Sequence, residues 1–145
     1  MKFSTRTRYG LRMMVFLGVN YGKGFTQLKE IANSERISIK YLEHIVRLLK
    51  PSGLISVARG AKGGYALVKE PSKINLKELF LILEGHYEPV ECVAPEKKCK
   101  LKDVCSTYDV WCELSVVINK YLESITLGKL VNHYLKKHNK NMYYI

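Results

Sequence analysis

Residues 26–67 decide the fold, and they read TQLKEIANSERISIKYLEHIVRLLKPSGLISVARGAKGGYAL. The start of this stretch predicts a short helix capped by Thr26, followed by a turn over residues 33–36. Ser38 favours a second helix, because its hydroxyl can accept a hydrogen bond from a free amide of the first turn. Pro51 then indicates where the second helix ends.

The second helix has one apolar face and one polar face. Its apolar residues recur every three or four positions: they are Leu42, Ile45, Val46 and Leu49. Two short helices, the second with a polar outer face, are typical of a helix-turn-helix that reads the major groove of DNA. The residues expected to contact DNA from this unit are Thr26, Ser38, Lys40, Tyr41, Glu43, His44 and Arg47.

A basic hairpin is predicted immediately after the two helices. Strand-like residues 54–59 and 65–68 flank a glycine-rich turn, which indicates two antiparallel strands. We expect Arg59, Gly60 and Lys62 to contact DNA, with the arginine directed at the minor groove, where a narrow groove deepens the negative potential. The sequence therefore predicts a winged helix-turn-helix, in a mainly α fold with a small β-hairpin.

The positive charge is concentrated in the half of the chain that carries this motif. The chain has 145 residues and a formal net charge of +11, of which +10 falls in residues 1–80 and +1 in residues 81–145. A positive field of this kind favours binding to a polyanion. No paired acids, nucleophile–base pair or phosphate-binding loop is evident in the sequence, so we expect no enzyme activity.

The cellular location can be inferred only from what the sequence lacks. No apolar run approaches the roughly 18 residues of a membrane span, and the beginning of the chain does not resemble a signal peptide. We therefore expect a cytoplasmic protein without a membrane partner. In that compartment cysteines are more often metal ligands or redox groups than structural disulfides.

Three cysteines lie in a segment without apolar periodicity. Cys92, Cys99 and Cys105 are separated by six and five residues, and lysines lie between them. Thiolates are ligands suited to iron–sulfur clusters and zinc. A fourth thiol, Cys112, lies two helical turns after Cys105, where a packing role is the simpler interpretation.

Three further helices are expected around these features. One covers residues 4–21, one begins at Asn75 and ends at Gly85, and a long one runs from about residue 106 to 122 or beyond. The long helix has apolar residues at alternating steps of three and four, which favours pairing with a second copy of the helix. The residues expected to form this dimer contact are Trp111, Leu114, Ile118, Tyr121 and Ile125.

We therefore expect three parts. Residues 1–85 form the winged helix-turn-helix domain, residues 86–105 the cysteine loop, and residues 106–145 the dimerisation helix and tail. Residues 126–130 are expected to fold back on the core. The tail beyond them is basic to residue 140 and ends Met142-Tyr143-Tyr144-Ile145.

Nearly the whole chain resembles the IscR-like iron–sulfur cluster regulators, a family of bacterial winged-helix transcription factors. The residues that carry the resemblance are Ser4-Thr5, Arg8-Tyr9, Ile37-Ser38, Tyr41-Leu42-Glu43, Arg59-Gly60, Gly63-Gly64-Tyr65, the three cysteines, Trp111 and Ile125-Thr126-Leu127. The resemblance implies a homodimeric regulator, with a repressor expected over an activator, that binds an operator in double-stranded DNA. It also implies a cluster on Cys92, Cys99 and Cys105, [2Fe–2S] rather than [4Fe–4S], that senses iron–sulfur, redox or nitric-oxide status.

One position departs from the pattern of that family. Members with a histidine as the fourth cluster ligand place it three residues after the third cysteine, where this chain has Tyr108. Another branch takes an acidic residue from the partner's first helix, where this chain offers Arg8. The fourth ligand is left open between Tyr108, Asp109, Cys112, a small thiol and solvent.

Two alternatives to cluster sensing also stay open. A related branch of the family lacks the cysteines, regulates cysteine metabolism and docks an enzyme of that pathway, and the Tyr143-Tyr144-Ile145 ending resembles its tail. The chain could thus be a cluster-free regulator of cysteine or sulfur metabolism that acts through a partner enzyme or through thiol oxidation. An iron–sulfur carrier or electron-transfer protein is less favoured, because such a protein has no need of a basic helix-turn-helix half.

The charge distribution leads to a prediction about salt. The association constant for a short DNA duplex should fall linearly with salt on a log–log plot, with each neutralised phosphate contributing about −0.9 to the slope. Fluorescence anisotropy between about 50 and 300 mM salt measures the slope. A flat response would show that the basic half does not neutralise phosphates.

Overall fold

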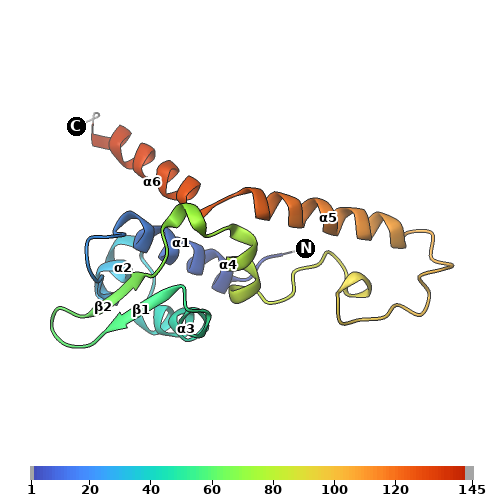
Figure 1. Ribbon diagram of the computed structural model, residues 1–145, viewed down its shortest axis with the longest axis horizontal. Coiled ribbons are helices and arrows are strands. Elements are labelled where there is room, and N and C mark those ends of the chain that lie inside the picture. Colours follow the sequence, from blue (N-terminus) through green and yellow to red (C-terminus); the bar gives the residue numbers. More distant parts are fainter. Residues whose placement is uncertain (1, 143–145) are drawn as a thin grey trace.

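The computed structural model of the protein describes residues 2–142 and has the expected mainly helical architecture with one hairpin (Figure 1). Its helices and strands are α1 (Thr5–Val19), α2 (Leu28–Glu35), α3 (Ile39–Leu49), β1 (Ile55–Ala58), β2 (Gly64–Leu67), α4 (Leu76–Leu83), α5 (Tyr108–Ser124) and α6 (Leu127–Met142). Short 3-10 turns lie at η1 (Lys50–Ser52), η2 (Pro71–Lys73) and η3 (Glu91–Val93). The helix-turn-helix and hairpin form one end, and α5 with the cysteine loop extends to the other.

Helix α1 is the centre of the core. Its residues Met13, Met14 and Leu17 are completely or almost completely buried, and it packs against α2, α3, α4, α6 and β2. Ser4 caps it as expected, because the Ser4 hydroxyl accepts a hydrogen bond of 3.2 Å from the Thr7 amide. This apolar helix is therefore buried on several sides, and burial of its apolar surface stabilises the winged domain.

Helix α2 does not begin as the sequence predicts. Thr26 was expected to cap it, but the cap is Gln27, which forms a capping box with Glu30. The Thr26 backbone instead exchanges two hydrogen bonds of 2.8 Å with Tyr65. The prediction is wrong because this pairing with a residue distant in sequence holds Thr26 in an extended conformation, one residue before the cap Gln27.

The turn between α2 and α3 also lies later than expected. Residues 33–35 still belong to α2, and Arg36 ends it in the left-handed conformation, with φ 53°. Ile37 is buried directly after the turn. Ser38 caps α3 as predicted, accepting a 3.2 Å hydrogen bond from the Tyr41 amide, and the four predicted apolar residues of α3 are buried.

The hairpin is antiparallel, and its register runs from the pair Ile55–Leu67 to the pair Ala58–Gly64. Gly64 has φ 144°, and a Cβ atom there would lie 2.3 Å from the Thr26 carbonyl oxygen. Only glycine allows this close approach of the two backbones. The glycine-rich turn is therefore needed to seat the hairpin on the start of α2.

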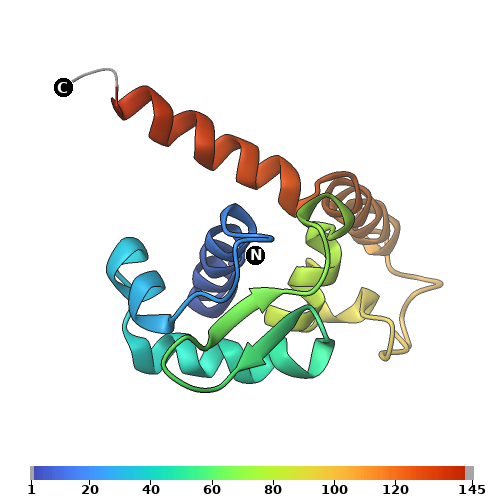
Figure 2. The same ribbon diagram turned by 60° about the vertical axis from the view of Figure 1, so that its left-hand side comes forward.

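Helix α6 was not predicted. The sequence indicated only that residues 126–130 fold back on the core, and the buried Leu127 agrees with this, but the helix continues to Met142 (Figure 2). It crosses α1 at Gly18, where a Cβ atom would lie 2.6 Å from Val131 Cγ2. The tail residues Tyr143–Ile145 lie outside the described residues. None of the described helices has the length and apolarity needed to cross a membrane.

Glu84 joins the end of α4 to the start of α1. Its carboxylate accepts hydrogen bonds from the Ser4 hydroxyl (2.7 Å), the Ser4 amide (3.1 Å) and the Thr7 hydroxyl. Arg6 donates to the Glu84 carbonyl at 3.3 Å. Burial acts to raise the pKa of Glu84, but the hydrogen bonds from Thr7 and Ser4 outweigh it and hold the pKa below its usual value.

Replacing Glu84 with glutamine should lower the free energy of unfolding by about 1–2 kcal/mol at pH 7, because hydrogen bonds to a charged acceptor are lost. Since the folded-state pKa is lowered, the carboxylate stabilises the protein above pH 4.5, its ordinary value, and this stabilisation is lost as pH falls through the folded-state pKa. Urea unfolding of wild type and E84Q at several pH values should show the difference shrinking below pH 4.5. The matched control is E70Q, at an exposed glutamate; equal losses in the two variants would contradict the assigned role.

Candidate nucleic-acid interface and metal centre

The outer face of α3 gathers most of the residues predicted to contact DNA. Lys40, Glu43, His44 and Arg47 are exposed. A shallow hollow of about 360 Å³ is lined by Ser38, Lys40, Tyr41, His44 and Arg47. These side chains offer two cationic groups, an imidazole and two hydroxyls on one surface, which is the donor and acceptor inventory needed for base edges and phosphates.

Aromatic side chains pack behind the outer face of α3. The Tyr41 ring packs edge-on against Tyr9 of α1, with ring centroids 5.5 Å apart, and against His44 at 6.0 Å. The Arg12 guanidinium lies over the Tyr9 ring at 5.5 Å, and its Nε atom is 2.9 Å from Glu35. These contacts hold α3 in position against α1 and the end of α2.

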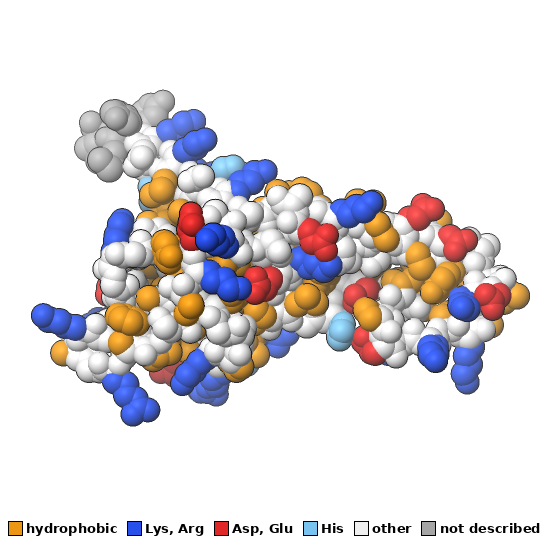
Figure 3. Space-filling model, in the orientation of Figure 1, with side chains coloured by type: hydrophobic (Ala, Val, Ile, Leu, Met, Phe, Trp, Pro, Cys, Tyr) orange, Lys and Arg blue, Asp and Glu red, His pale blue; other side chains and the backbone are white. Residues whose placement is uncertain are grey.

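The hairpin presents the other predicted contacts. Arg59, Gly60 and Lys62 are exposed, and the arginine and lysine side chains make no hydrogen bond or ion pair with other described residues. Basic side chains project from the hairpin end of the molecule in Figure 3. The two cationic groups are therefore available to an anionic partner.

Gln27 is a positioning residue that the sequence analysis missed. Its side-chain nitrogen donates a 2.9 Å hydrogen bond to the Ala61 carbonyl, so the start of α2 is tied to the hairpin turn. The capping-box spacing of Gln27 and Glu30 was the available signal. Thr26, by contrast, was predicted to contact DNA, and that prediction is wrong. Thr26 is only 4% exposed, because its backbone pairs with Tyr65 of the hairpin.

The cysteine loop is folded back on α5. All four cysteines are free and half-buried. The turn η3, which contains Cys92, packs against α5, and Cys99 lines a pocket of about 370 Å³ with Tyr108, Lys97, Lys98 and Lys102. The structure therefore brings Cys92 and Cys99 to the start of α5, among lysine side chains.

Cys105 lies three residues before the start of α5. Its Sγ atom is 3.4 Å from the Thr107 hydroxyl. This hydrogen bond lowers the pKa of the Cys105 thiol, while the nearby charge of Asp109 opposes the shift. A lowered pKa favours the thiolate, the form that binds metals.

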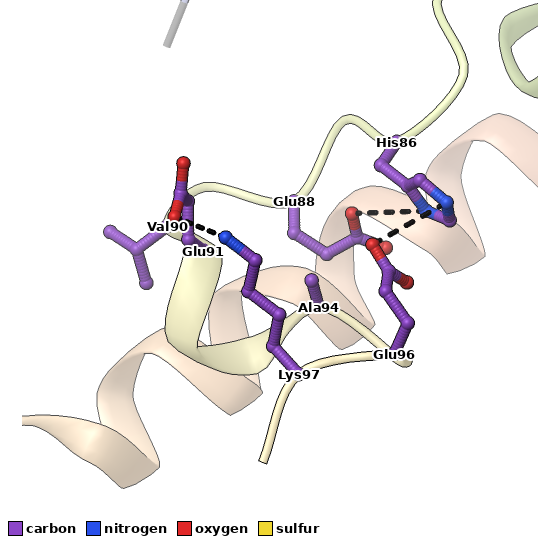
Figure 4. Close-up of a pocket in the computed structure, with 7 residues that line it drawn as sticks. All are labelled: His86, Glu88, Val90, Glu91, Ala94, Glu96 and Lys97. Atoms are coloured by element: carbon purple, nitrogen blue, oxygen red, sulfur yellow. Dashed lines mark hydrogen bonds and ion pairs between the residues drawn. The ribbon is translucent and has the colours of Figure 1, made fainter. Parts of the chain in front are cut away.

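The loop is closed by ion pairs around a cavity of about 240 Å³ (Figure 4). His86 lies between two carboxylates, with Nε2 3.5 Å from Glu96 and Nδ1 4.0 Å from Glu88, and Lys97 pairs with Glu91. One buried carboxylate oxygen of Glu88 has no hydrogen-bond partner among the described residues. Exposed pairs of this kind each contribute little stability, so the loop is held weakly in place.

The cysteines of the loop have the chemistry that an iron–sulfur cluster needs, but they are not arranged to hold one. Three thiols, one of them with a lowered pKa, and neighbouring lysines match the soft ligands and charge balance of such a cluster. Within the described residues, however, no three cysteine, histidine or acidic side chains are arranged to hold a metal ion. Binding a cluster would therefore require the loop to rearrange.

The predicted dimer contact is largely unpartnered within one chain. Leu114 is 39% exposed and Tyr121 64% exposed, while Trp111 and Ile118 are half-buried. The prediction that Ile125 contributes to the dimer contact is wrong. Ile125 follows the end of α5, is only 7% exposed and belongs to the chain's own core. Its carbonyl accepts a 2.9 Å hydrogen bond from the Leu76 amide, which explains why it turns inward.

The chain is similar to known bacterial transcriptional regulators. The Rrf2 family, described as "Iron-dependent Transcriptional regulator", matches residues 3–133. The HTH-type transcriptional regulator CymR of Bacillus subtilis is 36% identical over 145 residues, all of both chains. The HTH-type transcriptional regulator IscR of Klebsiella pneumoniae is 32% identical over 133 residues, 92% of this chain and 81% of that one.

A solved structure agrees with these relatives. The structure of CymR, titled the global cysteine regulator of B. subtilis, has a TM-score of 0.76 and 35% sequence identity, over 92% of this chain and 98% of that one. These relatives are named as regulators, in agreement with the expectation that the chain is not an enzyme. With its winged helix-turn-helix and its match over residues 3–133, the chain belongs to the Rrf2 family of DNA-binding transcriptional regulators.

Proposed function

We propose that the protein is a homodimeric repressor whose affinity for its operator is set by an iron–sulfur cluster on Cys92, Cys99 and Cys105. The observation that carries the proposal is the presence of a cysteine loop, lined by lysines and folded on α5, in a chain whose other end is a basic winged helix-turn-helix. Similarity to IscR supports the same function.

In this proposal two surfaces of the winged domain contact DNA. The outer face of α3, with Ser38, Lys40 and Arg47, enters the major groove, and Arg59 of the hairpin enters the adjacent minor groove. The backbone pairing of Thr26 with Tyr65 keeps the hairpin at a fixed position relative to α3. Two such units bind two half-sites when the dimer forms.

The dimer forms through α5. Leu114 and Tyr121 are the most exposed of the residues assigned to this contact, and Val110 and Val117 add further exposed apolar surface beside them. Apolar surface concentrated on one helix favours association. A symmetric pair of α5 helices buries this surface and fixes the separation of the two half-site contacts. The parts proposed are residues 1–85 for DNA, 86–105 for the cluster and 106–145 for the dimer.

The loop is connected to the DNA-binding part by packed side chains. Tyr87 is buried, packs against Phe80 of α4 with ring centroids 5.8 Å apart, and donates a 3.1 Å hydrogen bond to Asn119 of α5. When bound, the cluster would supply a redox- and oxygen-sensitive link among the thiols. A change in the loop would then act on α4 and α5 together, provided that the cluster binds two dimer conformations unequally.

A second candidate function is favoured by the full-length similarity to CymR. Because CymR is titled a global cysteine regulator, the chain could regulate cysteine or sulfur metabolism without a cluster, through thiol oxidation or a metabolic enzyme as partner. The two functions differ in whether the anaerobically isolated protein contains iron and sulfide.

Replacing Arg59 with alanine should weaken binding to a duplex selected by the wild-type protein by about 5- to 150-fold, the range expected for loss of one groove contact worth about 1–3 kcal/mol. Gel-shift titration at fixed salt measures the change. K120A, which removes an exposed cation from α5, is the control and should have little effect. Equal affinities for wild type and R59A would refute the role of the hairpin.

Replacing Cys92, Cys99 or Cys105 with alanine should remove most of the visible absorbance, iron and acid-labile sulfide of protein purified without oxygen, because each thiolate is a ligand. The neighbouring S106A variant should keep all three signals. If all three cysteine variants retain colour and iron, the ligand assignment is wrong. If the wild-type protein contains neither iron nor sulfide after reconstitution, the cluster-free function is favoured.

A further inference from the structure

A groove of about 480 Å³ lies between α1 and α6. The two helices cross where Gly18 meets Val131, and α6 passes over α1 in Figure 2. This volume is in the range of about 300–1,000 Å³ that is typical of sites for small organic molecules. The α1–α6 groove shares no lining residue with the hollow on α3 or with the pocket beside Cys99, so it is a separate feature of the molecule.

Each of the two helices contributes one stripe of side chains to the groove. The α1 stripe consists of Arg8, Leu11, Arg12 and Val15. The α6 stripe consists of Leu130, His133, Tyr134 and Lys137. Residues three and four positions apart lie on the same side of a helix, so each stripe faces the groove over its whole length. That length is about 10 Å, at a rise of 1.5 Å per residue.

The groove is apolar near the crossing of the helices and cationic away from it. Leu11, Val15 and Leu130 are half-buried, and the last two lie within one helical turn of the crossing. Arg8 and Lys137 are exposed and lie at the other ends of the two stripes. The groove therefore offers apolar surface at one end and positive charge at the other.

The cations at the open end of the groove have no acidic partner. Among the described residues, the Lys137 side chain makes no hydrogen bond or ion pair, and that of Arg8 donates only to the Thr5 hydroxyl, at 3.3 Å. Glu35 also lines the groove, but its carboxylate is already paired with Arg12. Uncompensated positive charge beside apolar surface favours an anion with an apolar body, because charges attract more strongly where water is partly excluded.

Arg12 connects the groove to the helix that faces DNA. Its Nε atom is 2.9 Å from Glu35, the last residue of α2, and its guanidinium lies over the Tyr9 ring. Tyr9 packs in turn against Tyr41 of α3. An anion in the groove competes with Glu35 for the guanidinium. Its binding therefore weakens a contact that holds α1, the end of α2 and α3 together.

We propose that the α1–α6 groove binds a small anion with an apolar body, of the class of medium-chain carboxylates, and that this ligand lowers the affinity for DNA. Its carboxylate lies between Arg8 and Lys137, and its apolar body packs on Leu11, Val15 and Leu130. By linkage, DNA lowers the affinity for the ligand by the same factor. The inference does not depend on the cluster, so either proposal can fail while the other stands.

Calorimetric titration of the wild-type protein with octanoate tests the site. Octanol has the same apolar body without the charge, octylammonium reverses the charge, and acetate lacks the apolar body. We expect saturable binding of octanoate and at least about tenfold weaker binding of the other three probes, because each lacks one of the two complementary features. Absence of saturable octanoate binding, or equal binding of octanoate and octylammonium, would overturn the proposal.

A pair of double variants tests the position of the carboxylate. R8Q/K137Q removes two cations of the groove and should weaken octanoate binding at least about fivefold, because charge-assisted hydrogen bonds are lost. K129Q/K136Q removes two exposed cations of α6 that do not line the groove, and it should bind octanoate as wild type does. Circular dichroism confirms that both variants fold. Equal losses in the two variants would reveal only an effect of net charge and would refute the site.

Gel-shift titration in the presence of octanoate tests the effect on DNA binding. Saturating octanoate should lower the affinity of the wild-type protein for DNA at least about threefold relative to acetate at the same ionic strength. The same concentration of octanoate should have no such effect on R8Q/K137Q. Equal affinities of the wild-type protein in octanoate and acetate would contradict the proposed coupling.

Analytical ultracentrifugation distinguishes the ligand from the other possible occupant of the groove, a second copy of the chain. Saturating octanoate should leave the oligomeric state of the wild-type protein unchanged. Dissociation by octanoate would mean that the groove is a contact between copies, and the ligand proposal would then be wrong.

Discussion

Burial of α1 between the other elements is the constraint on which the rest of the structure depends. Met13, Met14 and Leu17 fill the centre of the core, and α2, α3, α4, α6 and β2 all pack on this helix. Because protein interiors are close-packed and transmit small displacements, these elements cannot shift independently. Helix α3, the hairpin and helix α6 are thus held by one core.

The DNA-binding end combines a rigid frame with free cations. Backbone hydrogen bonds between Thr26 and Tyr65, and the bond from Gln27 to Ala61, fix the hairpin on α2. The edge-on contact of Tyr41 with Tyr9 holds α3 on α1. Arg59 and Lys62 take no part in these contacts, so their charges stay available at little cost in stability. A frame of this kind lowers the ordering cost when DNA binds.

The end of the molecule that carries the cysteine loop is held by weaker interactions. The cysteine loop has little apolar surface to bury, and its ion pairs are largely exposed. Segments with few buried apolar contacts open at low free-energy cost. Metal–thiolate bonds would therefore contribute a large share of the order in this region, whereas they could add little to the core around α1. Such a division suits a protein in which one end is fixed and the other responds, with Tyr87 connecting the two.

The sequence by itself determined the features that depend on neighbours along the chain. The Ser38 cap, the buried face of α3, the glycine-rich hairpin and the exposed cations all follow from local spacing. Only the tertiary structure decided that Gln27 and not Thr26 caps α2, since Thr26 is paired with Tyr65. The structure likewise revealed α6 as a helix, because its few apolar residues gain their burial from α1, and it turned Ile125 into the core. Local hydrogen bonds and periodicity can be read from a sequence, whereas contacts between residues far apart in the chain exist only once the core has formed.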